Sequence, residues 1–332
     1  MADLNAAVIG LGIGKEHARA LAAMDGVRLC AVADLDLDLA RRIAAERGAR
    51  AYGSGAELLA GEALDLVCVC TNPRTHLPLT QDAAGRGVHV FCEKPMASSL
   101  AHCDGMILAC RTAGVKLMVG QKKRFLPAFR LVKEKLEGEW GPARWCLMRY
   151  ALGRVGRPWF WQEDDGGGPL VENSVHMFDM MRFLLGEPVR VYAEGGNLFN
   201  AQWEPQLDTA CVTVRFAGGA IAAIGCGQAS EWFFASEGTY LSTDHALVEV
   251  TGPFDNPDRV RFARRDDPGS VCELPQPRQD AFNLELSHFV ECLRTGAEPA
   301  CTGEDARGSI AVCLAVKESI RRGQPVDLGT AA

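Results

Sequence analysis

The chain has 332 residues, 48% of them hydrophobic and 23% charged, and its formal net charge is −7. This length suits two domains, each with its own core. The acidic balance argues against a nucleic-acid partner, and no apolar run is long enough to span a bilayer.

Thirteen cysteines are scattered through apolar segments such as Val67-Cys68-Val69-Cys70. They form no Cys-x-x-Cys pair, and the chain has no histidine-rich cluster, so we expect no metal site. Reduced, mostly buried thiols are typical of a cytoplasmic protein. The N-terminal residues show no signal peptide, which agrees with a cytoplasmic location.

The first thirty-four residues predict a strand, a glycine loop, a helix and a second strand that ends in an acid. The loop glycines are Gly10, Gly12 and Gly14, and the acid is Asp34. Glycines let the backbone approach a pyrophosphate, and a helix N-terminus offers unpaired N–H groups to its charge. An acid roughly twenty residues further along can accept hydrogen bonds from a ribose diol. The order predicts a dinucleotide site.

The glycine spacing departs from the usual fingerprint. The third glycine is expected three residues after Gly12, where Lys15 stands, and Gly14 follows Ile13 one residue early. The tight turn and the close backbone approach survive this contraction. A strand–helix turn that merely needs glycine is the alternative.

Asp34 also bears on cofactor choice. A carboxylate there repels the 2′-phosphate of NADP, and Leu35 and Asp36 supply no positive charge to receive it. Arg41 and Arg42 lie further into the next helix and are expected to face solvent. The expected cofactor is NAD.

Up to about residue 120, apolar strands alternate with helical patterns, which predicts a parallel sheet covered on both faces. The expected strands are 6–10, 29–33, 66–71, 89–92 and 116–120. The expected helices are 14–24, 37–47, 77–86 and 100–112, with a shorter one around Leu58 and Leu59.

After residue 120, strand patterns follow one another without helical crossovers, which predicts a mostly antiparallel sheet. The expected strands are 145–150, 189–194, 210–216, 220–225, 247–251 and 259–263. The expected helices are 174–185, 282–294 and 303–322, the last with Thr302 and Asp305 in capping-box spacing.

The fourth expected strand ends in Glu93-Lys94-Pro95. Ligands of a parallel sheet bind at the carboxyl ends of its strands, so Lys94 is placed where a nicotinamide would lie. Proline restricts Lys94 to an extended backbone. Alone, such a tripeptide is usually a surface turn, but its strand position and the upstream glycine loop favour a site.

Further motifs span nearly the whole chain. They are Gly10-Leu11-Gly12 with His17, Thr71-Asn72-Pro73 with His76, Glu93-Lys94-Pro95, Val119-Gly120 with Arg124-Phe125 and Pro127, Gly166-Gly167-Gly168-Pro169-Leu170 leading to His176 and Asp179, and Thr302-Gly303-Glu304-Asp305-Ala306. With these motifs the chain resembles the glucose–fructose oxidoreductase, inositol dehydrogenase and rhizopine-catabolism (Gfo/Idh/MocA) family. Members handle many sugars, cyclitols and nucleotide sugars, so the resemblance specifies no substrate.

The resemblance implies an α/β fold. A Rossmann dinucleotide-binding domain is expected over 1–121, and an α+β domain with an open-faced, mostly antiparallel sheet over 122–332. The second domain is expected to bind substrate and form the oligomer, and the helix at 303–322 to pack back on the first.

The resemblance also implies site residues. Lys94 matches the catalytic lysine, and His176 matches the histidine that acts with a carboxylate four residues earlier, here Glu172 in place of the usual aspartate. Ser174 stands where glycine is common. The cofactor-binding positions are Gly10, Gly12, Ile13, Gly14, Asp34, Thr71, Asn72, Pro73, His76, Glu93 and Lys94. Substrate contacts are expected from Glu172, Asn173 and His176 and, from their position and chemistry, from Lys122, Arg124, Trp159 and Trp161.

Chemistry supports the same catalytic group. Oxidising a secondary alcohol needs a base near neutrality for the hydroxyl proton. His176 needs little tuning, whereas Lys94 needs a lowered pKa, which burial beside an oxidised nicotinamide provides. On a continuous helix Glu172 and His176 lie one turn apart and meet on one face, although such a pair alone is usually an ordinary surface pair. Which group takes the proton stays open, because coupled groups titrate together.

Other residues allow two interpretations. Lys122, Lys123 and Arg124 either contact substrate or form a solvated charge run. The aromatic segment Trp159–Trp161 either stacks on a sugar ring or belongs to the core. His17 and His76 are expected to bond within the cofactor fold.

The expected function is NAD(H)-dependent hydride transfer at a ring secondary alcohol of a sugar or cyclitol. The alternatives are an NAD-retaining sugar-modifying enzyme, which cleaves or epimerises by transient oxidation, and a catalytically silent NAD-sensing protein. Because 210–214 and 220–225 are apolar or small at nearly every position, both sheet faces should be covered. A homodimer or homotetramer is therefore expected.

Overall fold

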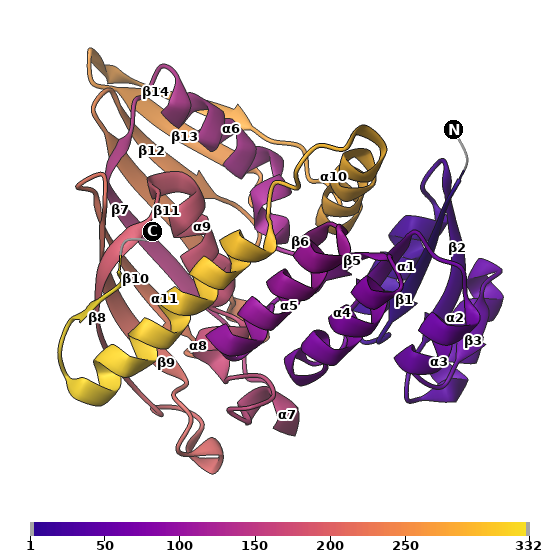
Figure 1. The fold of residues 1–332 in the computed structure, drawn as a ribbon. Helices are drawn as coiled ribbons and strands as arrows, with labels where there is room; N and C mark the ends of the chain where they lie inside the picture. Colours follow the sequence, from indigo (N-terminus) through magenta and orange to yellow (C-terminus); the bar gives the residue numbers. More distant parts are fainter. Residues whose placement is uncertain (1–2, 330–332) are drawn as a thin grey trace. The chain divides into compact units, whose positions relative to one another are not determined.

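The computed structural model describes residues 3–329, which divide into two compact units. The first unit runs up to Lys122 and includes Asp280–Arg307. The second comprises Lys123–Gln279 and the chain from Gly308 onward. Figure 1 colours the chain by sequence, so the orange helix α10 stands out among the indigo and purple elements of the first unit.

Six parallel strands form the sheet of the first unit, in the order β3-β2-β1-β4-β5-β6. They are β1 (Leu4–Ile9), β2 (Val27–Ala33), β3 (Arg50–Tyr52), β4 (Leu66–Val69), β5 (His89–Cys92) and β6 (Leu117–Val119). All residues of β4 and β6 are buried, as in a sheet covered on both faces. The strand order reverses between β1 and β4, which is where such sheets bind ligands.

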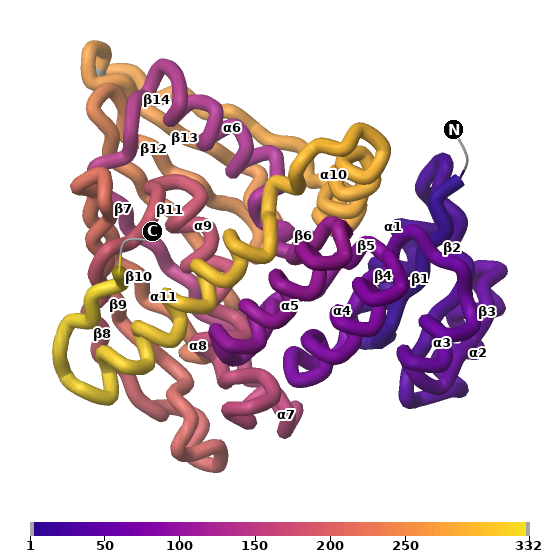
Figure 2. Tube along the Cα trace, viewed as in Figure 1, coloured from indigo at the N-terminus to yellow at the C-terminus, as the bar shows by residue number. Residues whose placement is uncertain are grey.

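The helices of the first unit come from both ends of the sequence. They are α1 (Gly14–Ala22), α2 (Leu37–Arg47), α3 (Gly55–Gly61), α4 (His76–Gly85), α5 (Leu100–Ala113), α10 (Ala281–Thr295) and the first turn of α11 (Gly303–Arg322). Helices α4 and α5 lie side by side (Figure 2), and α10 packs against α1.

Nine strands form the sheet of the second unit, in the order β14-β13-β12-β11-β7-β10-β9-β8-β15. They are β7 (Ala143–Ala151), β8 (Pro188–Gly196), β9 (Thr209–Phe216), β10 (Ile221–Gly227), β11 (Ser236–Thr243), β12 (Ala246–Thr251), β13 (Arg259–Arg264), β14 (Asp267–Pro275) and β15 (Val326–Asp327). Strands β7 and β10 pair in parallel, and the other neighbours are antiparallel.

Helices of the second unit cover one face of this sheet (Figure 1). They are α6 (Pro127–Glu137), α8 (Pro169–Glu172), α9 (Val175–Leu185) and the rest of α11, and the short α7 (Pro158–Trp161) precedes α8. Ser319 of α11 accepts the Ala193 N–H of β8 at 3.0 Å. Residues of β9 alternate between buried and exposed, so no part of residues 3–329 covers the opposite face of the sheet there.

The predicted α/β fold, with a parallel sheet followed by a mostly antiparallel one, is confirmed. The predicted helix at 37–47 has the observed bounds. The sequence missed helix α6, the short helices α7 and α8, and four strands, namely β3, β11, β14 and β15. None of the thirteen cysteines is disulfide-bonded and ten are buried, as expected. Across residues 3–329, no helix has the length and apolarity that a membrane span requires.

Candidate functional site

The glycine loop after β1 retains all three glycine functions despite its contraction. Gly10 has a φ of +88°, and a Cβ there would stand 2.7 Å from the Cys70 carbonyl oxygen. Gly12 has open space where its Cβ would point. A Cβ on Gly14 would stand 2.9 Å from Cγ1 of Val8, so this glycine provides the close helix–strand packing.

The N-terminus of α1, like that of α4, has no side-chain cap. Side chains of Asp36, Ser54 and Ser99 cap α2, α3 and α5, whereas Ile13 at the start of α1 offers no capping group. The Glu16 N–H donates to the Ile13 carbonyl oxygen at 2.9 Å, and no side-chain cap takes the N–H groups before it, as a pyrophosphate site requires. The backbone fits a dinucleotide.

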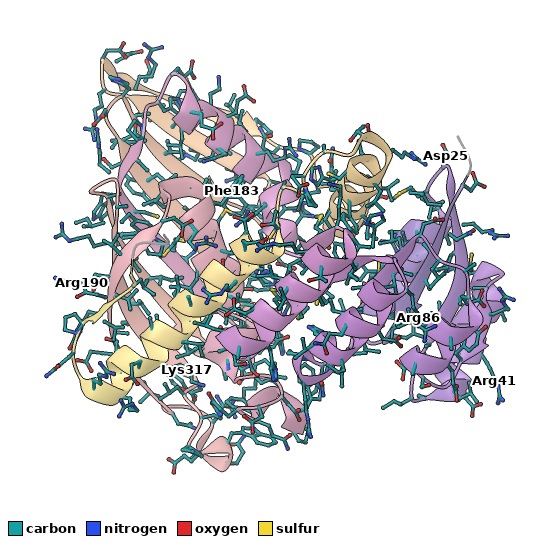
Figure 3. All side chains as sticks on the ribbon, in the orientation of Figure 1. Asp25, Arg41, Arg86, Phe183, Arg190 and Lys317 are labelled. Atoms are coloured by element: carbon teal, nitrogen blue, oxygen red, sulfur yellow. The ribbon has the colours of Figure 1, made fainter. Side chains whose placement is uncertain are left out.

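Asp34 follows β2 and is tied to the loop. Its Oδ2 accepts the Leu11 N–H at 2.6 Å, and its Oδ1 accepts the Asp36 N–H at 2.9 Å. Arg41 is exposed and pairs with Asp38 on α2, as its place on the surface in Figure 3 shows. Its guanidinium therefore has a local partner of its own.

The segment Thr71-Asn72-Pro73 follows β4, and a short 3₁₀ helix begins at Pro73. His76, fully buried, lies with Nε2 3.1 Å from the Thr71 carbonyl oxygen and Nδ1 3.1 Å from that of Met96. Burial lowers the pKa of His76, which favours the neutral ring. As predicted, this histidine bonds within the fold, where it joins the loops after β4 and β5.

Glu93, Lys94 and Pro95 follow β5 at the same edge of the sheet. Lys94 is half-buried, Glu93 is buried, and the Lys94–Pro95 peptide is cis. His17 hydrogen-bonds to Glu93, which again agrees with the expected bonding inside the fold. Lys122 is half-buried, with Nζ 4.7 Å from the centroid of the Phe282 ring.

In the second unit, Glu172 and His176 do not share one continuous helix. Glu172 ends α8, and His176 lies in the first turn of α9, with a turn at Asn173 and Ser174 between them. The break arises because the Ser174 N–H reaches back five residues to the Pro169 carbonyl oxygen at 3.0 Å. The one-helix geometry expected for this pair is therefore wrong. His176 is buried and Glu172 half-buried, while the buried Nδ2 of Asn173 has no hydrogen-bond partner among the described residues.

The glycines before α8 approach their own chain. A Cβ on Gly166 would stand 2.6 Å from the Phe160 carbonyl oxygen. Gly167 has a φ of +74°, and its carbonyl oxygen accepts a hydrogen bond from Lys317 of α11, labelled in Figure 3, at 3.2 Å. The space that these glycines leave is filled by protein.

Two residues of the aromatic segment at α7, Phe160 and Trp161, are buried. Trp161 is buried, stacks on Trp203 with ring centroids 5.5 Å apart, and donates its Nε1–H to the Val155 carbonyl oxygen at 2.7 Å. Both contacts give Trp161 a structural role. Trp159 is only half-buried.

Lys123 and Arg124 are buried, so the alternative of a solvated charge run does not hold for these two residues. Lys123 is buried, with Nζ 2.7 Å from Oε2 of Glu237 and 2.9 Å from Oδ1 of Asp255. Burial opposes the charge on Lys123, but the two carboxylates raise the pKa of its ammonium group. Sequence reasoning missed both carboxylates, because they lie more than a hundred residues away along the chain.

Arg124 is also engaged within the second unit. Its guanidinium makes a bidentate pair with the buried carboxylate of Asp179, at 2.7 and 2.8 Å. Ser309 donates its hydroxyl to the same carboxylate at 2.8 Å. This pair joins two segments of the second unit and occupies the guanidinium of Arg124, which therefore has a structural role.

Comparison with known proteins agrees with this geometry. Residues 4–121 match the model of an oxidoreductase family with an NAD-binding Rossmann fold, and residues 129–236 match the GFO/IDH/MocA C-terminal domain. The chain is 31% identical to the myo-inositol 2-dehydrogenase of Thermotoga maritima, over 97% of both chains. It is 30% identical to the D-apiose dehydrogenase of Paraburkholderia graminis, over 97% of this chain and 89% of that one.

A solved structure of an oxidoreductase from Agrobacterium radiobacter, in complex with NAD+, L-tartaric acid and magnesium, has the same fold. Its TM-score is 0.87 at 22% identity, with all of both chains covered. The family matches cover both units, and the glycine loop and the Glu93-Lys94-Pro95 segment lie at one edge of the parallel sheet. The chain belongs to the Gfo/Idh/MocA family of NAD(P)-dependent oxidoreductases.

Proposed function

We propose that this protein is an NAD(H)-dependent dehydrogenase that transfers hydride between nicotinamide and a ring secondary alcohol or ketone of a sugar or cyclitol. The observation that carries the proposal is the half-buried Lys94 at the carboxyl end of β5, beside a glycine loop that fits a dinucleotide. The similarity over 97% of the chain to enzymes that act on myo-inositol and D-apiose supports this substrate class.

The preference for NAD rests on Asp34. Its carboxylate lies against the glycine loop, where it accepts the Leu11 N–H, so an adenosine ribose bound on this loop meets a negative charge. A 2′-phosphate at that place would be repelled. Thr71, Asn72 and Pro73 follow the neighbouring strand β4 and contribute to the same cofactor site, and His76 contributes indirectly by holding the Thr71 carbonyl.

The chemistry divides between the two parts of the chain. When bound, nicotinamide supplies the hydride acceptor for alcohol oxidation. Lys94 and His176 hold and move the hydroxyl proton of the substrate, and Glu172 with Asn173 orients the ring hydroxyls. Lys122 and Trp159, both half-buried, complete the proposed substrate contacts.

A substrate screen tests this function. The full chain is incubated with NAD+ or NADP+ and a panel that includes myo-inositol, scyllo-inositol and D-apiose, and NADH absorbance is followed. We expect net NADH formation with at least one polyol and a preference for NAD+. A changed sugar without net NADH would favour the NAD-retaining enzyme, and bound NAD without any turnover would favour the sensing protein.

We also infer a homodimer or homotetramer that uses the open face of the nine-stranded sheet. On this face Leu147, Ile221 and Tyr240 are 43%, 45% and 37% exposed, and a shallow hollow runs across β7, β10 and β11. A soluble chain seldom leaves such a surface uncovered. Light scattering after size exclusion should give at least twice the mass of one chain, and Tyr240→Glu should weaken the assembly. A single species of one chain's mass contradicts this inference.

A further inference from the structure

Three ionisable side chains that the proposed chemistry does not use meet inside the first unit. His17 lies on α1, Glu93 follows β5 and Glu285 lies on α10, and their ligand-type atoms are all within 4.8 Å of one another. His17 and Glu285 have no exposed surface, and Glu93 is 5% exposed. Ionisable groups are seldom buried so completely unless they are paired.

Glu93 connects this cluster to the proposed catalytic lysine. One carboxylate oxygen, Oε1, lies 2.7 Å from Nε2 of His17, and the other, Oε2, accepts the backbone N–H of Lys94 at 2.9 Å. The first distance is that of a charge-assisted hydrogen bond, and two ligands of a tetrahedral zinc ion would stand roughly 3.3 Å apart. The contact between His17 and Glu93 is therefore a hydrogen bond and does not have the spacing of two ligands on one zinc ion.

The charge on Glu93 is maintained by its surroundings. Burial opposes ionisation, but the hydrogen bond from His17 and the charges of His17, Lys94 and Lys122 hold the pKa of Glu93 below its usual value. An ionised carboxylate accepts two hydrogen bonds at once more strongly than a neutral one. Glu93 can thus bond to the His17 ring and to the Lys94 backbone N–H at the same time.

The imidazole of His17 is held from two sides. Its ring centroid is 5.1 Å from that of Phe91 on β5 and 5.2 Å from that of Phe282 on α10. Glu285, one turn beyond Phe282, reaches the cluster beside Gly120, where a Cβ would stand 3.6 Å from its Oε2. The carboxylate thus lies in ordinary contact distance of this position, whereas a Cβ there would crowd the Phe91 ring at 3.1 Å.

Helix α10 is anchored to the N-terminal part of the same unit. Asp280, which caps α10, pairs with Arg19 of α1, and Arg294 near its C-terminal end donates to the Gly26 carbonyl oxygen at 3.0 Å. The helix that supplies Phe282 and Glu285 is thus fixed at both ends against the segment that carries His17.

We propose that His17 is a positioning residue, which acts through Glu93 to fix Lys94 relative to the glycine loop. His17 stands in the first turn of α1, and α1 begins at Gly14, so one rigid helix joins the loop that approaches the cofactor to the carboxylate that holds Lys94. A misplacement of about 1 Å in a reacting group is enough to lower turnover roughly 100-fold. The inference rests on the proposed function only in taking Lys94 as a proton-handling group.

The test compares three variants of the full chain. His17→Leu removes the donor to Glu93, and His17→Gln places an amide N–H near the position of Nε2. His89→Leu is the matched control, because His89 lies at the other end of β5 and its Nδ1 accepts the Lys116 N–H at 2.9 Å. Melting temperature and NAD+ affinity verify that each variant is folded.

Two readouts are measured. One is kcat and KM with the best polyol of the screen. The other is the rate at which acetic anhydride labels Lys94, followed by peptide mapping over a range of pH, which needs no substrate. We expect His17→Leu to lower kcat roughly 10- to 100-fold with little change in NAD+ affinity. We also expect an altered pH profile of Lys94 labelling, with recovery of most of the loss in His17→Gln and no change in His89→Leu.

A folded His17→Leu variant with wild-type kcat and a wild-type Lys94 labelling profile overturns the proposal. If His17→Leu does not fold, Glu93→Gln is judged by the same criterion, because it removes the charge and keeps the size of the side chain. If no polyol is oxidised, the proposed function fails, but the labelling profile of Lys94 still decides whether His17 positions it.

Discussion

Both units of this protein bury a cluster of charged side chains, and the two clusters are connected differently. In the first unit, Glu93 bonds to His17 with one oxygen and to the Lys94 N–H with the other. In the second unit, Oε2 of Glu237 bonds to Lys123 and also accepts the Asp255 N–H at 3.0 Å. The first cluster leads to a half-buried amine, whereas the second joins protein segments to one another.

This difference separates two meanings of a buried charge. A buried ion pair whose two partners bond only to the protein holds segments of the fold together. Its loss lowers the free energy of unfolding. When a buried charge also positions a residue of a ligand site, its loss lowers kcat. Variants in the two units should therefore change different observables, and the following predictions test that division in order of expected size.

The largest effect is expected for Lys123→Met, which leaves the buried Glu237 without its cation. We expect the free energy of unfolding to fall by about 3–5 kcal/mol, because an uncompensated buried charge remains. All six tryptophans lie between Trp140 and Trp232, so tryptophan fluorescence during urea unfolding reports on the second unit alone. The exposed pair of Arg144 and Asp244 provides the control, and Arg144→Ala should leave the curve unchanged. An unchanged urea unfolding curve for Lys123→Met would contradict the stabilising role assigned to the buried cluster of the second unit.

Next in size are Lys94→Ala and His176→Ala, each expected to lower kcat by roughly two orders of magnitude or more, as for general acid–base groups. NAD+ affinity should change much less for His176→Ala, since His176 lies in the second unit. Kinetics at saturating substrate and titration calorimetry measure the two effects, with His245→Ala as an exposed control. Near-wild-type turnover in either variant contradicts the assignment.

A smaller effect is expected for Asp34→Ala. The variant loses the acceptor for the ribose hydroxyls and for the Leu11 N–H, so NAD+ binding should weaken by roughly tenfold, and discrimination against NADP+ should narrow. Titration calorimetry with both cofactors measures this, and Glu46→Ala, at an exposed position of α2, is the control. Tighter binding of NADP+ than NAD+ by the wild type would falsify this interpretation of Asp34.

The smallest effect concerns pH and His76. Because burial lowers the pKa of His76 in the folded state, the unfolded chain takes up the proton first on acidification. The stability that His76 contributes is complete above the unfolded pKa of about 6.5 and is lost as pH falls through that value, by at most about 1.4 kcal/mol per pH unit. Urea unfolding between neutral and mildly acidic pH should show this slope in the wild type and less of it in His76→Gln.

Some strands of the two sheets could be predicted from the sequence and others could not. Strands β4 and β5 are continuous apolar runs with glycine or polar ends, so their position and the residues that follow them were predicted. Strand β14 contains Asp267, Gly269 and Glu273 and therefore shows no apolar pattern. Strand β3 has only three residues, which is too short for a pattern. Such strands are stabilised by their neighbours more than by their own composition.

Site residues could be predicted from the sequence only where they lie in one continuous segment. Gly10, Gly12, Asp34 and Lys94 could be proposed from the sequence because the order of strand, loop and helix is local. The break between Glu172 and His176 was not foreseen, since nothing in the spacing of two residues tells whether the helix between them is continuous. Glu285 carries the one signal that could have been used, a charge inside the apolar face made by Phe282, Leu286 and Phe289.

The sequence by itself determined the order of elements, the dinucleotide loop, the acid after β2 and the lysine after β5, because hydrophobic periodicity and glycine spacing act over a few residues. The tertiary structure alone decided which distant charges meet. It brought Glu285 to His17 and Glu93, and it brought Glu237 and Asp255 to Lys123. The physical reason is that a buried charge is stabilised by a partner of suitable geometry, and chain folding, not sequence distance, sets that geometry.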